Sequence, residues 1–97
     1  MPTYILLAKF TDQGIRNIKE SPKREEAFGK LCETMGAKVK DAYRTMGRYD
    51  LAAVVDAPDD VTINAILYSI GSLGTVRTET LRAFSRQETE AALAMMA

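Results

Sequence analysis

The stretch GRYDLAAVVDAPDD, residues 47–60, decides the fold, because a turn, a strand and a helix start follow one another in it. Its centre, Leu51 to Val55, is short, apolar and bounded by turn residues, which is typical of a strand buried on both faces. Asp50 stands where this strand begins, although aspartate is depleted in strands and a buried carboxylate needs a hydrogen-bond donor. This conflict makes Asp50 the first candidate for a functional residue.

Further strands and helices are predicted on either side of this stretch. The predicted strands are residues 3–10, 38–45, 49–56 and 75–84. A short helical turn is expected after Thr11. A longer helix is predicted from Ser21, as a capping hydroxyl followed by proline, to Gly36. Gly29 inside this helix is expected to mark close packing.

A second helix is predicted to begin at Pro58 and to end at the glycines at positions 71 and 74. The spacing from Ser85 to Glu88 is that of a capping box, which predicts a short C-terminal helix. In the second helix, the apolar residues at helical spacing should form its buried stripe, and these are Ile63, Ile66, Leu67 and Ile70.

The predicted order of elements is βαββαβ plus a tail helix. With right-handed crossovers, this order gives a ferredoxin-like α+β fold, an antiparallel sheet of strand order 4-1-3-2 with both helices on one face. Residues 3–10 are apolar at both parities, so both faces of that strand should be covered. The simplest cover for the helix-free face is a second copy, which predicts a homodimer, a dimeric α/β barrel.

The composition is that of one soluble globular domain, residues 1–97, with 46% hydrophobic and 27% charged residues. Lys plus Arg and Asp plus Glu both number 13, so no basic excess indicates nucleic acid as a partner. The single cysteine, Cys32, excludes an internal disulfide, favours a reducing compartment and is expected to be an inert core residue. No leader or membrane-spanning pattern is found, and a cytoplasmic location is expected.

The chain contains no histidine. This excludes Ser-His and Cys-His nucleophile pairs and histidine-based metal sites. We therefore expect neither a metal nor another cofactor.

Antiparallel pairing predicts a cluster of polar residues at one end of the sheet. The strand at residues 3–10 ends where the strands at residues 49–56 and 75–84 begin. The residues expected there, as candidates for binding a small ligand, are Lys9, Tyr43, Tyr49, Asp50 and Arg77. The alternative is structural, with Asp50 paired to Lys9 or Arg77 and the tyrosine rings buried at a rim or interface.

The Asp50 carboxylate is expected within reach of a donor at this end of the sheet. The donors considered are Lys9, Arg77, a tyrosine hydroxyl and the amides of residues 11–14. Lys19, Lys23 and Arg24 are instead expected on a solvated helix face.

Over nearly the whole chain, the sequence resembles the GYD domain proteins. The family's name-giving pattern spans Gly47 to Asp50, with Arg48 between the glycine and the tyrosine. The other matching segments are residues 1–4, 10–16, 21–22, 57–60 and 76–84. The resemblance implies a ferredoxin-like relative of the dimeric α/β barrels and implies no particular chemistry.

These observations favour a non-enzymatic, homo-oligomeric domain that binds a small ligand or a protein partner and does not bind nucleic acid or membranes. The alternative is a cofactor-independent isomerase or oxygenase acting on a small organic molecule. In that case Asp50 would be the base, and Tyr49 or Arg77 would stabilise an oxyanion. This alternative rests on analogy of fold.

Overall fold

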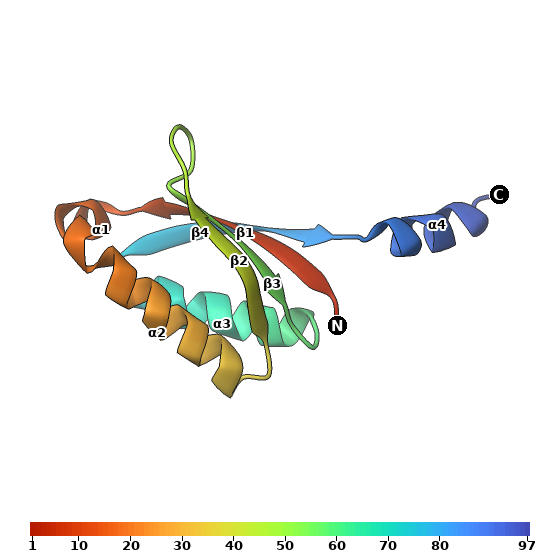
Figure 1. The fold of residues 1–97 in the computed structure, drawn as a ribbon, viewed down its shortest axis with the longest axis horizontal. Coiled ribbons are helices and arrows are strands. Elements are labelled where there is room, and N and C mark those ends of the chain that lie inside the picture. The colour runs from red at the N-terminus through yellow and green to blue at the C-terminus, as the bar shows by residue number, and fades with distance from the viewer.

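One four-stranded antiparallel sheet, in the order β2-β3-β1-β4, forms the centre of the molecule (Figure 1). The structure, a computed structural model, describes all 97 residues. Its elements are β1 (Thr3–Phe10), α1 (Asp12–Arg16), the 3-10 turn η1 (Ile18–Glu20), α2 (Ser21–Thr34), β2 (Lys38–Arg44), β3 (Leu51–Asp56), α3 (Asp60–Ser72), β4 (Val76–Ala83) and α4 (Arg86–Ala94). The predicted strand order is confirmed, since 4-1-3-2 is the same order counted from the other edge.

Helices α2 and α3 lie together on one face of the sheet, as predicted, and α4 points away from it (Figure 1). The core is formed where the two helices meet the inward side chains of β1 and β3. Its members are Tyr4, Leu6, Cys32, Ala37, Val55, Ala57, Ile63 and Ile66. None of the helices has the length and apolar character needed to cross a bilayer.

The start of one predicted helix and the cap of another differ from the structure. Helix α3 begins at Asp60 rather than Pro58, because the Asp59 side chain caps it by accepting from the Thr62 amide at 2.8 Å. Helix α2 does begin at Ser21, but the Ser21 hydroxyl does not cap it. That hydroxyl is buried and accepts a hydrogen bond from Arg44 instead.

Close packing at a glycine occurs at a different position from the one predicted. A Cβ at Gly29 would meet nothing within 4 Å, so the expected close packing there is wrong. The close approach is at Gly14, in the short helix α1, which caps on Thr11 as expected. A Cβ at Gly14 would lie 2.0 Å from the carbonyl oxygen of Thr75. The backbone therefore packs on backbone where α1 meets the start of β4.

The sheet surface without helices is here called the open face. Tyr4, Leu6 and Ala8 are buried under the helices, so the alternate residues of β1 lie on the open face. The pairing of β1 with β3 and β4 places residues of those two strands beside the open-face residues of β1. The apolar centre of the open face consists of Ile5, Leu7, Ala52, Val54 and Leu81.

Candidate functional site

The connection between β2 and β3 is hydrogen-bonded to β1 through Asp50. It contains Gly47, which has a positive φ of 97° that favours glycine. The Asp50 amide donates to the Ala8 carbonyl at 2.8 Å. The Asp50 carboxylate accepts from the Phe10 amide, also at 2.8 Å. Asp50 thus continues the pairing of β3 with β1 through its side chain, which explains an aspartate at a strand start.

The expected donor to Asp50 therefore exists, but its identity was predicted wrongly. It is the amide of Phe10, the last residue of β1, and no ion pair joins Asp50 to Lys9 or Arg77. Lys9 and Arg77 are register partners in β1 and β4, but the Arg77 guanidinium reaches toward α3, where its Nη1 would lie 3.7 Å from a Cβ at Gly71.

The two tyrosines of the predicted cluster have different surroundings. The Tyr49 hydroxyl donates to the Glu79 carboxylate, and this hydrogen bond raises the pKa of Tyr49 above its ordinary value. Tyr49 is thereby tied to β4. Tyr43, on the edge strand β2, is 60% exposed. All five predicted residues lie at the same end of the sheet, but they do not converge on one closed pocket.

A cavity of about 200 Å³ does open at this end, on the helix-covered side of the sheet. Of its 20 lining residues, 14 are hydrophobic. They come from all four strands, from both covering helices and from the segment before β4. The apolar walls include Leu6, Ala8, Phe10, Ala27, Phe28, Leu31, Leu51, Ala53, Ile70 and Val76. Tyr43 is the only one of the five predicted residues that lines this cavity.

The polar lining residues of this cavity include a group at the start of α2 and the end of β2. Arg44 forms an ion pair with Glu25 and donates through Nη2 to the Ser21 hydroxyl at 2.9 Å. Arg24 donates to two backbone carbonyls, Asn17 through Nη1 and Gly14 through Nη2, each at 3.2 Å. Arg24 has no carboxylate partner.

Sequence reasoning missed this group of residues. Arg24 was expected on a solvated helix face with Lys23, and that prediction is wrong because its guanidinium lies 5.8 Å from the centre of the Phe10 ring. A signal was present in the sequence, since Arg24 falls one helical turn before Phe28 and two turns before Leu31, on the apolar side of α2.

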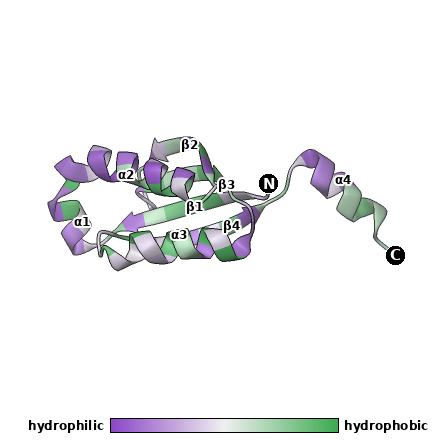
Figure 2. Cartoon of the chain, turned by 90° about the horizontal axis from the view of Figure 1, so that it is seen from below, coloured by the Kyte–Doolittle hydropathy of each residue, from purple (hydrophilic) through white to green (hydrophobic).

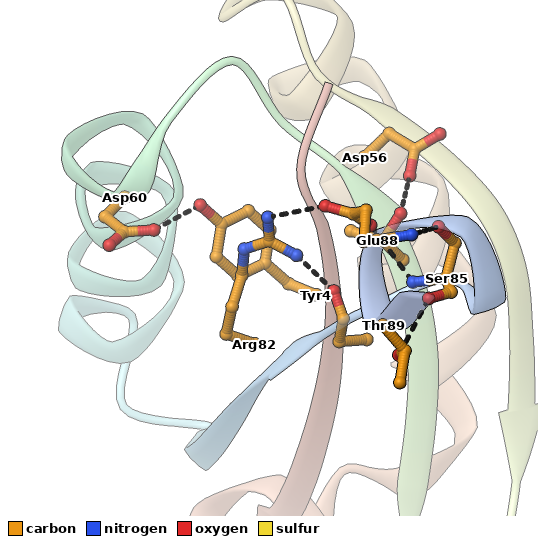
Figure 3. Close-up of polar contacts among 9 residues, drawn as sticks. Tyr4, Asp56, Asp60, Arg82, Ser85, Glu88 and Thr89 are labelled. Atoms are coloured by element: carbon orange, nitrogen blue, oxygen red, sulfur yellow. Dashed lines mark hydrogen bonds and ion pairs between the residues drawn. The ribbon is translucent and has the colours of Figure 1, made fainter. Parts of the chain in front are cut away.

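A second polar network lies at the opposite end of the sheet (Figure 3). The Tyr4 hydroxyl donates to the Asp60 carboxylate. Burial, and then this hydrogen bond, raise the pKa of Tyr4 to about 12. Arg82 lies over the Tyr4 ring and donates to Glu88, which belongs to the capping box with Ser85. The network connects the sheet to the first turn of α4.

Neither the single cysteine nor the acidic side chains form a further site. Cys32 is fully buried, and burial raises the pKa of its thiol to about 11, so the thiol stays protonated at neutral pH. No three His, Cys, Asp or Glu side chains lie close enough together to hold a metal ion.

Comparison with known proteins places this geometry in a family. The GYD domain matches residues 4–93. A relative from Thermus thermophilus is named glutamine synthetase and cystathionine beta-lyase binding protein. It is 36% identical over 84 residues, which cover 86% of this chain and 88% of the relative.

Two solved structures have the same fold. The crystal structure of TTHA0845 from Thermus thermophilus is 30% identical, with a TM-score of 0.57 over 88% of this chain and 95% of that one. The crystal structure of FFRP-DM1 is 21% identical, with a TM-score of 0.63 over 87% of this chain and 100% of that one. At that identity, the second likeness concerns the fold alone.

Proposed function

This chain belongs to the GYD domain family, and on that premise we propose that it is a non-enzymatic, homo-oligomeric module that binds protein partners in the cytoplasm. One observation carries the proposal. The relative that is 36% identical across 86% of the chain is named as a binding protein for two enzymes. The single cysteine, which favours a reducing compartment, supports the cytoplasmic location.

The open face supports the homo-oligomeric part of the proposal. Its centre carries the aliphatic side chains of Ile5, Leu7 and Val54 where a soluble monomer would carry polar residues. A domain of 97 residues buries only about two thirds of its unfolded surface, so covering this face would add stability. The partner for this face is a second copy of the chain, sheet against sheet.

Helix α4 supports the protein-binding part. It extends away from the sheet and changes from hydrophilic at its start to hydrophobic at its end (Figure 2). The exposed fractions of the apolar residues at its end and just beyond it are 59% for Leu93, 85% for Met95 and 72% for Met96. Flexible methionine side chains adapt to different surfaces, which suits a module that binds more than one enzyme.

Two hydrogen bonds support a binding module rather than an isomerase or oxygenase. The Asp50 carboxylate, which would be the base, accepts from the Phe10 amide. The Tyr49 hydroxyl, which would stabilise an oxyanion, donates to Glu79. Both groups thus have structural partners in the resting fold.

Surface plasmon resonance with purified glutamine synthetase and cystathionine β-lyase from the same organism tests the proposal. We expect at least one enzyme to bind, and the combined change Leu93→Ser, Met95→Ser and Met96→Ser to weaken binding about tenfold or more, as loss of a contact centre does. The matched control is Val61→Ser with Tyr68→Ser, which removes exposed apolar groups from α3 and should leave binding unchanged. Failure of both enzymes to bind the wild-type chain would overturn the proposal.

A further inference from the structure

We propose that the cavity between α2, α3 and the sheet binds a small apolar monocarboxylate, with its hydrocarbon part inside and its carboxylate at Arg24. The cavity opens on the helix-covered side of the sheet, shares only Ala52 with the centre of the open face and has no lining residue from α4. The inference therefore goes beyond protein binding and does not depend on it.

The size and lining of the cavity fit the hydrocarbon part of such a ligand. Its volume is about 200 Å³, and 14 of its 20 lining residues are hydrophobic. An apolar cavity of about 150 Å³ is large enough to bind benzene. Small side chains on the sheet side, Ala8 and Ala53, leave the space that Phe28 and Leu31 of α2 do not fill.

The charges among the lining residues fit a single anion. Arg44 is neutralised by Glu25, whereas Arg24 is held by the carbonyls of residues 14 and 17 and lies over the Phe10 ring. These carbonyls fix the position of the guanidinium but do not compensate its charge. A guanidinium also keeps further N–H donors for a carboxylate, which it binds well in a bidentate manner.

The Ser21 hydroxyl supplies a second donor next to Arg44. Ser21 is only 5% exposed and lines the cavity. Its oxygen accepts from Arg44 at 2.9 Å, and its own proton is donated to no acceptor in the protein. A buried donor without an acceptor is costly, and a ligand carboxylate oxygen would provide one.

The first test compares acids with uncharged analogues of the same shape. Phenylacetate and 4-methylpentanoate are titrated by isothermal calorimetry against phenylacetamide and 4-methylpentanamide. We expect each acid to bind about tenfold or more tightly than its amide, the size of effect of one charge-assisted hydrogen bond. The variant Arg24→Gln should abolish this preference. Lys23→Gln, on the neighbouring exposed position, should retain it.

The second test locates the ligand. Amide shift changes in nuclear magnetic resonance spectra should concentrate at Phe28, Ala53 and Ile70, around the cavity, and be absent at Leu7 and Leu81 on the open face. Ala53→Leu should fill the cavity and abolish binding of acids and amides alike. Because the shift map uses the wild-type chain, it holds even if Ala53→Leu does not fold.

Several results would overturn the inference. These are no binding of any probe, equal affinity for acid and amide, an acid preference that survives Arg24→Gln, or shift changes centred on the open face. Failure of both enzymes to bind the wild-type chain bears only on the proposed function, so the failure of one proposal is distinguishable from the failure of the other.

Discussion

The carboxylate of Asp50 accepts the backbone amide of Phe10 over 2.8 Å, across a sequence separation of 40 residues. Replacing Asp50 by alanine leaves this partly buried amide without an acceptor. We expect Asp50→Ala to lower the free energy of unfolding by about 1–3 kcal/mol. Asp50→Asn keeps an acceptor oxygen and should recover most of that loss.

Urea unfolding at a protein concentration that keeps the oligomer intact measures these changes. Asp41→Ala is the matched control, because Asp41 is exposed on the edge strand β2 and has no ion pair there. A change within about 0.5 kcal/mol for Asp50→Ala would remove Asp50 as a structural anchor. A gain in stability would instead favour a functional role, because functional residues are often held at a cost in stability.

Two glycines should respond to alanine in opposite directions. At Gly14 the new methyl group would lie 2.0 Å from the Thr75 carbonyl oxygen, a backbone atom that cannot turn aside. We expect Gly14→Ala to destabilise the fold by about 1–3 kcal/mol or more. At Gly29 the methyl group meets nothing within 4 Å, and Gly29→Ala should stabilise α2 by about 0.5–1 kcal/mol. Equal thermal shifts for the two variants would contradict this assignment.

The open face should hold two copies together at micromolar concentration. Leu7→Lys places a charge at the centre of that face, and in a monomer the lysine can pair with its register partner Glu79. The variant should therefore stay folded but sediment as a monomer. Tyr68→Lys, on the exposed surface of α3, is the control and should remain dimeric. A monomeric wild-type chain in the same experiment would refute the dimer.

Stability should fall at alkaline pH partly through Tyr4. Burial and the bond to Asp60 raise the pKa of Tyr4 from 10.0 to about 12 in the folded chain. Between these values the unfolded chain binds fewer protons than the folded one. The contribution of Tyr4 is thus complete below pH 10 and is lost as pH rises through 12. Urea melts across this range should show a weaker decline for Tyr4→Phe than for the wild-type chain, and equal declines would contradict the prediction.

Much of the fold follows from the sequence because its signals are local or periodic. The apolar parities of β1, the recurring isoleucines of α3 and the capping box at Ser85 each predict an element that the structure contains. Errors occur where a long-range partner decides the outcome. Ser21 has the chemistry of a helix cap, but Arg44 from β2 takes its hydroxyl.

The candidate site was less predictable for the same reason. Topology brings Lys9, Tyr49, Asp50 and Arg77 to one end of the sheet, as expected, but it does not say to which face each side chain turns. The cavity depends on small side chains, such as Ala8 and Ala53, leaving room under α2. An alanine in a strand carries no signal of an empty volume, since the volume is set by residues far away in the sequence.

The turn from Gly47 to Asp50 has a consequence for the kinetics of folding. Its bonds from Asp50 to Phe10 and from Tyr49 to Glu79 close loops of 40 and 30 residues. Contacts of this kind cost loop-closure entropy until the strands that carry them have paired, so we expect them to form after the transition state. Interactions absent from the transition state slow unfolding and leave the folding rate nearly unchanged. We therefore expect the two hydrogen bonds of this turn to lengthen the lifetime of the folded chain.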